Sequence, residues 1–246
     1  VTTILACLYL IYAGILPKAL ALLLVGPIFA LEAVFLASNL TKVLDGGFVP
    51  LTVAAGLGLV MWAWWRGTQL VLVKAHKQLV PLEGFVRSMA RSSAHVVPGT
   101  AFFLSPDADV VPSALLHNLK HNRVLHSQNI ILTIETLRTP TADPAERAEY
   151  EALGERFGRL TLRFGFMETP NVSRAMVEAR KAGLKFDVMT SSFFLGRRRP
   201  VVSGPLTVRR MLDRLYAILT RFAADPSDFY SLPRDRLVEL GERVTV

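Results

Sequence analysis

Charged residues are distributed unevenly along this chain of 246 residues, and their density changes at Arg66. Residues 67–246 carry 43 charged side chains, of which 25 are Lys or Arg and 18 are Asp or Glu. An apolar stretch followed by an ordinarily charged one predicts membrane helices joined to a water-soluble domain. The first 65 residues carry only four charged side chains, Lys18, Glu32, Lys42 and Asp45.

Two segments of the first part are long and apolar enough to cross a bilayer. Residues 19–38 contain one charge, Glu32, and would extend about 30 Å as a helix. Residues 48–65 contain no charge and lie near the lower length limit for a span. Residues 1–12 are as apolar but too short to cross, and neither an initial Met nor a cleavable leader precedes them. We therefore expect the chain to begin inside a transmembrane helix and to be part of a larger protein.

Charge beside the spans predicts their orientation. Basic residues favour the cytoplasmic side, and the tryptophans just before Arg66 suit the membrane interface. Placing the residues after Arg66 in the cytoplasm makes the turn at Lys18 cytoplasmic and the loop at 41–47 external. The soluble part then lies in the cytosol. The single cysteine, Cys7, belongs to the first apolar segment, so no disulfide framework is available, which suits a reducing cytosol.

The soluble part has about 180 residues, enough for one domain with its own core. Its 25 basic and 18 acidic side chains leave a net charge of +7, and the pI of the chain is about 10.0. Nucleic-acid-binding proteins have such values. Cytoplasmic segments next to membrane helices share them, however, and we expect no nucleic acid partner.

Three parts are predicted: residues 1–66 in the membrane, a juxtamembrane connector at 67–96, and a cytosolic α/β domain at 97–246. The connector mixes apolar and basic residues, so it could lie on anionic head groups or simply link the other parts. Strand and helix patterns then alternate, which favours a largely parallel sheet with helices on its faces. We expect strands at 101–104, 129–135, 157–166, 186–195 and 237–246, helices at 112–122 and 208–223, and a loop with a short helix at 139–151. A further helix is expected to be capped by Thr169 or Asn171 and to end at Gly183.

Glu32 is the candidate transport residue. It lies in the second half of the first span, and a charge at the middle of a bilayer costs roughly 2.5–3.5 kcal/mol. Such a carboxyl must face a helix bundle, pair with another group or be protonated. Two roles stay open: an ion or proton relay, and an interhelical hydrogen bond or a hydrated position near the interface.

Two polar clusters of the soluble part are candidate sites. His117 and His121 share one helix face, a spacing that suits zinc. They lack the Glu of the His-Glu-x-x-His motif, and His126 falls beyond the expected helix end, so a capped structural helix is preferred. Arg197–Arg199 is interpreted as a solvated loop, with a phosphate, lipid or nucleotide ligand as the alternative. The sequence shows no Gly-x-Ser-x-Gly elbow or phosphate-binding loop, so neither an enzyme nor a cofactor is expected.

Several strings of residues resemble the Kup family of bacterial potassium uptake permeases. Some border the last span, the others lie in the soluble part, and together the resemblance runs nearly end to end. The strings are Phe35–Lys42, Gly46–Leu51, Met61–Trp62, Trp65–Gly67, Val97–Ala101, Leu115–Asn122, Val124–His126, Phe164–Val172, Ser192–Leu195 and Val238–Gly241.

This resemblance implies import of potassium ions across the inner, cytoplasmic membrane, in symport with protons. It implies the last transmembrane helices of an APC/LeuT-like transporter, embedded in the lipid bilayer and followed by an α/β cytosolic domain that regulates transport or forms a homodimer. Potassium-coordinating groups of the family lie in earlier spans, so none is carried over to this chain. The alternatives are a membrane-tethered ligand-sensing module outside any transporter and, less favoured, a His-based metalloenzyme.

Overall fold

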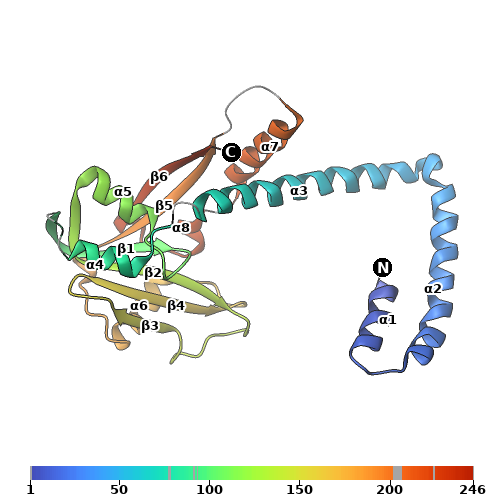
Figure 1. Cartoon of the computed structure of the whole chain (residues 1–246), viewed down its shortest axis with the longest axis horizontal. Coiled ribbons are helices and arrows are strands. Elements are labelled where there is room, and N and C mark those ends of the chain that lie inside the picture. The colour runs from blue at the N-terminus through green and yellow to red at the C-terminus, as the bar shows by residue number, and fades with distance from the viewer. Residues whose placement is uncertain are drawn as a thin grey trace. The chain divides into compact units, whose positions relative to one another are not determined.

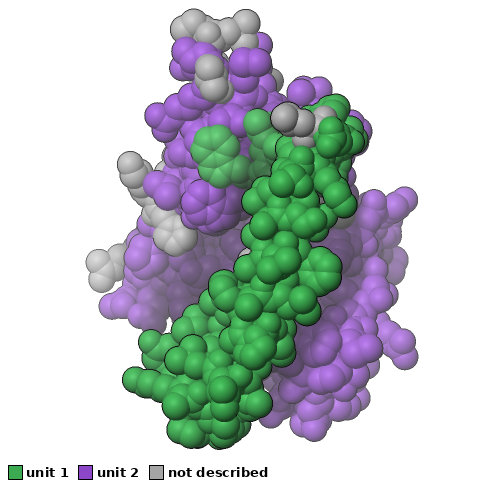
Figure 2. Space-filling model, turned by 90° about the vertical axis from the view of Figure 1, so that its right-hand side faces the viewer, with its two compact units in different colours: residues 1–62 green, residues 63–246 purple. Residues whose placement is uncertain are grey.

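The computed structural model divides into two compact units. Unit 1 comprises residues 1–62 and unit 2 comprises residues 63–246 (Figure 2). The boundary lies close to the change in charge density at Arg66. The described residues are 2–76, 79–90, 92, 94–201, 207–223 and 225–245.

Unit 1 consists of helices joined by two turns. Gly14 (φ 68°) and Gly46 (φ 116°) lie in these turns, in the left-handed region that glycine adopts without strain. Among the described residues, two helices, Lys18–Thr41 and Asp45–Lys74, are long and apolar enough to cross a membrane, and they contain the two predicted spans. The elements are α1 Thr2–Tyr12, α2 Lys18–Thr41, the turn η1 Val43–Gly47 and the start of α3 Phe48–His76.

The helix α3 continues beyond its predicted end. We expected the span to stop at Trp65 and a separate connector to follow, whereas one helix runs through to His76 (Figure 1). The residues beyond the apolar stretch pack against the rest of unit 2. Ala63, near the end of that stretch, is buried, and Gly67, beyond it, lies directly against the ring of Tyr216. Tertiary contacts therefore keep this charged segment helical.

Unit 2 is an α/β domain around a six-stranded sheet (Figure 1). The strand order is β3-β4-β2-β1-β5-β6, and every neighbouring pair is parallel except β3 and β4. The predicted largely parallel sheet is thus confirmed. The elements are α4 Leu82–Met89, β1 His95–Ser105, α5 Ser113–Asn122, β2 Val124–Leu137, β3 Ala148–Ala152, β4 Phe157–Gly165, α6 Val172–Lys181, η2 Val188–Thr190, β5 Ser191–Val201, α7 Val208–Phe222, α8 Pro226–Phe229, η3 Arg234–Arg236 and β6 Leu237–Thr245.

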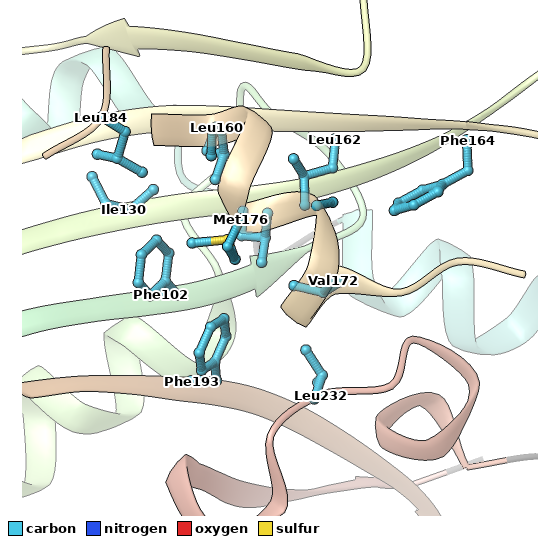
Figure 3. Packing of buried hydrophobic residues seen from close by; sticks show 13 residues of the cluster. Phe102, Ile130, Leu160, Leu162, Phe164, Val172, Met176, Leu184, Phe193 and Leu232 are labelled. Carbon is cyan, nitrogen blue, oxygen red and sulfur yellow. The ribbon is translucent and has the colours of Figure 1, made fainter. Parts of the chain in front are cut away.

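Side chains alternate between the two faces of the central strands. In β1, Phe102 joins the apolar cluster under α6, whereas Phe103 joins the cluster under α4 and α5. Figure 3 shows Phe102 packing with Met176 of α6 and with Phe193 of β5. Burying each such side chain contributes about 1.5–3 kcal/mol. Both faces of the sheet are covered, as a parallel sheet requires.

The connector is attached to this sheet by α4. Leu82 and Phe85 are buried in the cluster on the α5 face, and the Phe85 ring packs edge-on against Phe157 of β4 at 6.0 Å. The apolar side of α4 therefore covers protein. Of the two roles considered for the connector, linking the other parts fits α4 better than lying on head groups.

Two predictions, for β3 and for the start of β5, were wrong. The segment 139–151 leads into a strand, β3, instead of a short helix, because Glu149 and Glu151 pair with arginines of β4. The strand expected from residue 186 begins at Ser191 after a short 3-10 turn. Of the two caps expected for α6, the structure has Asn171, whose side chain accepts a hydrogen bond from the Arg174 amide at 2.8 Å, so Pro170 lies before the helix.

Candidate functional site

Glu32 is held by a hydrogen bond between the first two helices. The hydroxyl of Thr3 in α1 donates to Oε1 of Glu32 in α2. Polar bonds of this kind stabilise helix pairs in membranes. Of the two roles left open for Glu32, the observed contact corresponds to the interhelical hydrogen bond.

The His117 and His121 rings stack 5.7 Å apart on one face of α5, as their spacing predicted. Within the described residues, no group of three His, Cys, Asp or Glu side chains could hold a metal ion. Asn118 instead bonds the Val124 carbonyl at 3.3 Å and links the helix end to β2. His126 lies in β2, where burial lowers its pKa. These contacts fit the capped structural helix.

The arginine run lies within β5, so its interpretation as a loop was wrong. Nη2 of Arg197 lies 2.7 Å from Oδ2 of Asp225, and Nη1 lies 3.0 Å from Oε2 of Glu239 in β6. The hydrogen bond to Glu239 and the charge of Asp225 raise the pKa of Arg197. Arg197 thereby ties β6 and the start of α8 to β5. The side chains of Arg198 and Arg199 lie outside the described residues.

A pocket of about 330 Å³ opens where β1 ends. In the sheet, β2 and β4 lie on one side of β1, and β5 and β6 lie on the other, so the chain order reverses between β1 and β5. Open α/β sheets bind ligands at this switch point, beyond the carboxyl ends of their strands. The switch-point pocket is lined by Ser105, Asp107, Ser113, His117, Gly196 and Glu242, among others.

Close approach of β5 to α5 shapes this pocket. A Cβ atom on Gly196 would lie 2.8 Å from Oγ of Ser113, so only glycine fits there without a shift. Ser105 closes a tight turn, donating to the Asp107 carbonyl at 2.6 Å and accepting from the Asp107 amide at 3.3 Å. This pocket could not be predicted from the sequence, because the position of Gly196 beside Ser113 depends on strand order.

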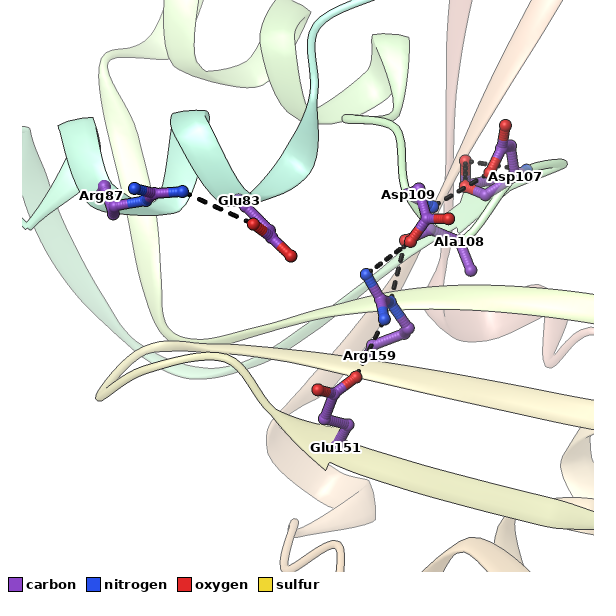
Figure 4. Close-up of polar contacts among 8 residues, drawn as sticks. Glu83, Arg87, Asp107, Ala108, Asp109, Glu151 and Arg159 are labelled. Atoms are coloured by element: carbon purple, nitrogen blue, oxygen red, sulfur yellow. Dashed lines mark hydrogen bonds and ion pairs between the residues drawn. The ribbon is translucent and has the colours of Figure 1, made fainter.

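The loop beside the pocket is held from two sides. On one side, the connector pairs with it: the Leu82 amide donates to the Asp109 carbonyl at 2.9 Å, and the Val111 amide donates to the Val80 carbonyl at 3.0 Å. On the other side, Arg159 of β4 bonds the Asp109 carboxylate at 2.7 Å (Figure 4). The connector and the pocket therefore share one loop.

A second cavity, of about 550 Å³, lies beside α6. Its wall includes Arg147 and Glu168, which pair at 2.6 Å. The Glu168 carboxylate also accepts hydrogen bonds from the amides of Gly165 and Ala142, at 2.6 and 3.2 Å. The bond to Arg147, followed by that to Gly165, lowers its pKa to about 2. These bonds hold the loop after β2 against the end of β4.

Comparison with known proteins covers both units. Residues 98–246 match the K+ potassium transporter C-terminal domain, and residues 1–69 match the K+ potassium transporter integral membrane domain. The chain is 47% identical over 249 residues to a probable potassium transport system protein Kup 1 of Sinorhizobium medicae, covering 100% of the chain and 40% of the relative. No solved structure matches the chain.

Two further relatives give the same picture. A probable Kup protein of Rhizobium rhizogenes is 47% identical over 234 residues, covering 94% of the chain and 37% of the relative. A probable Kup 2 protein of Rhodopseudomonas palustris is 45% identical over 230 residues, covering 94% of the chain and 36% of the relative. The chain thus spans 40% or less of the length of these relatives.

Proposed function

Because the chain belongs to the Kup family of K+ transporters, we propose that it is the C-terminal part of a permease that imports potassium ions in symport with protons. The supporting observation is that the family's integral membrane domain matches residues 1–69 and its C-terminal domain matches residues 98–246. In this proposal the ion pathway lies in membrane segments outside this chain, with an APC/LeuT-like arrangement. The protein lies in the cytoplasmic membrane with unit 2 in the cytosol.

Glu32 is the proposed proton-responsive group of this part. Symport requires a group whose protonation changes during the cycle, and Glu32 is the only charged residue between 19 and 38. Its bond from Thr3 links α2 to α1, so a change in protonation would alter a helix contact. The ion itself is not assigned to any residue of this chain.

Uptake of rubidium tests the transport proposal. The full-length protein would be expressed in cells that lack potassium uptake, and rubidium entry measured with and without a protonophore. We expect uptake that collapses with the proton gradient. Glu32→Gln should weaken that dependence, whereas Thr3→Ala removes only the hydrogen bond. Equal gradient dependence in wild type and Glu32→Gln would assign Glu32 a structural role.

Unit 2 is proposed to regulate transport or to mediate homodimer formation. The switch-point pocket supports regulation, because its loop pairs with the connector that leads to the membrane helices. Deleting residues 97–246 should change uptake kinetics or oligomeric state, and unchanged behaviour in both assays would contradict this role.

A point substitution can test the role of the pocket without removing unit 2. Gly196→Ala places a methyl group against Ser113, while Gly241→Ala on the neighbouring strand has no atom within 4 Å of its new Cβ. We expect altered uptake only for Gly196→Ala. The pocket also favours the second candidate, a tethered sensing module. Absence of rubidium uptake despite good membrane expression would make that module the preferred function.

A further inference from the structure

The cytosolic end of α3 and the start of α7 enclose a basic pocket of about 380 Å³. Both walls belong to unit 2. Arg66, Leu70 and Lys74 are spaced four residues apart and therefore share one face of α3. The residues contributed by α7 and its N-cap are Thr207, Arg209, Arg210 and Asp213.

Tight packing fixes the position of these walls. A Cβ atom on Gly67 would collide with Cγ of Tyr216, so the backbone of α3 rests on that ring. The rings of Trp64 and Tyr216 lie 5.6 Å apart, and Tyr216 is buried. Nη1 of Arg66 lies 2.6 Å from Oδ1 of Asp213. The pocket is therefore built by ordered contacts between the two helices.

Three arginines, Arg66, Arg209 and Arg210, line the pocket, and Asp213 is the only carboxylate among its lining residues. Nη2 of Arg66 and Nη1 of Arg210 are both buried without a hydrogen-bond partner among the described residues. A buried guanidinium N–H without an acceptor is costly. Both residues line the pocket, and a guanidinium group matches the oxygens of a phosphate group.

A second feature of α7 indicates where that phosphate comes from. Met211, Ile218 and Phe222 are spaced by seven and four residues, so they share one face, and their exposed fractions are 62%, 50% and 84%. Arg214 and Arg221 are also exposed on this helix. An exposed apolar stripe flanked by arginines is typical of helices that lie in the membrane interface.

The depth of the pocket agrees with this origin. Trp64 lies at the end of the uncharged stretch 48–65, and Arg66 follows that stretch directly, where lipid head groups begin. Since Tyr216 packs on α3 at this level, the apolar stripe of α7, which lies on the side of the helix away from Tyr216, would meet the interfacial region of the bilayer. We propose that the basic pocket binds the phosphate of an anionic phospholipid, with the stripe of α7 in contact with the acyl chains.

Lipid binding to the whole protein tests the site. Protein purified in detergent and stripped of lipid would be titrated with short-chain phosphatidylglycerol, and the bound lipid counted by native mass spectrometry. Arg210→Gln should weaken binding at least about tenfold, because a charged hydrogen bond is lost. The control is Arg87→Gln, an exposed arginine of α4 that lies outside both the pocket and the stripe of α7, and its affinity should stay within about twofold of wild type.

Several outcomes would overturn the proposal. Equal losses in both variants would show that only surface charge matters, and phosphatidylcholine bound as tightly as phosphatidylglycerol would remove the preference for an anion. Displacement of the lipid by millimolar inorganic phosphate would assign the pocket to free phosphate. If Arg210→Gln does not fold, Arg210→Lys keeps the charge and loses the fork, and wild-type affinity in that variant would equally contradict the site. The site is independent of potassium transport, so neither proposal fails with the other.

Discussion

The two units place the same kinds of apolar side chain in opposite surroundings. In unit 1, Leu23 is 70% exposed and Ala21 is the only buried apolar residue that the structure describes there. In unit 2, Phe102 and Phe103 are fully buried between sheet and helices. Unit 2 carries its own apolar interior, whereas unit 1 leaves its apolar surface for lipid or further helices. The stability of unit 2 is therefore encoded within this chain, and that of unit 1 depends on its surroundings.

Truncating one large side chain in each unit tests this difference most directly. Phe102→Ala should lower the free energy of unfolding of unit 2 by about 3–5 kcal/mol, through the lost burial and the cavity left behind. Leu23→Ala should leave that unfolding transition unchanged. Denaturant titration in micelles, followed by near-ultraviolet circular dichroism, measures both. A large effect of Leu23→Ala would mean that unit 2 depends on unit 1 for stability.

Two glycines of α3 test the same difference in packing within one helix. A Cβ atom added to Gly58 would have no neighbouring atom within 4 Å, whereas Gly67 lies against Tyr216. Ala normally stabilises a helix relative to Gly by roughly 0.5–1 kcal/mol, so Gly58→Ala should be neutral or stabilising. Gly67→Ala should instead cost about 1–3 kcal/mol through overpacking. Thermal unfolding of the two variants would refute the close packing if both shifts had the same sign.

Acid should affect unit 2 through Glu168. Its pKa falls from 4.5 to about 2 on folding, so the unfolded chain binds a proton more readily than the folded one. The stabilisation is complete above pH 4.5 and is lost as the pH falls toward 2. Glu168→Gln should remove this part of the pH dependence and flatten the loss of stability over that window. Denaturant titrations at a series of pH values would measure how steeply the free energy of unfolding depends on pH. An unchanged dependence in Glu168→Gln would exclude the pair of Arg147 and Glu168 as its cause.

The smallest expected effect concerns the ion pairs at the surface of unit 2. Arg159→Gln should destabilise by less than about 1 kcal/mol, because the carboxylates of Asp109 and Glu151 that it binds are largely exposed. Arg87→Gln, which removes an exposed pair with Glu83 at 3.5 Å, serves as the control and should have no measurable effect (Figure 4). Equal losses in the two variants would show that Arg159 does not anchor the loop.

Sequence analysis predicted the parts of the fold that depend on local pattern. The low charge before Arg66 indicated both spans, and the apolar runs around Phe102 and Ile131 indicated central strands. The strand β3 was not predicted, because Glu149 and Glu151 give its sequence the polar character of a loop. They become a strand only beside Arg163 and Arg159 of β4, which the local pattern does not reveal.

The candidate sites divide in the same way. The shared face of His117 and His121 follows from helix periodicity and was predicted, whereas the partners of Arg197 lie far along the chain. The basic pocket joins Arg66 to Asp213, 147 residues later. Such pairings depend on the order of strands and the packing of helices, so they could not be predicted from neighbouring residues alone.

The short strand β3 has a consequence for the behaviour of unit 2 in solution. It forms one edge of the sheet, and its Glu149 and Glu151 are each bound to an arginine of β4. Brief, charged edge strands resist pairing with strands from other molecules, a common route to aggregation. Any continuous sheet shared between two copies would have to form at the opposite edge, along β6.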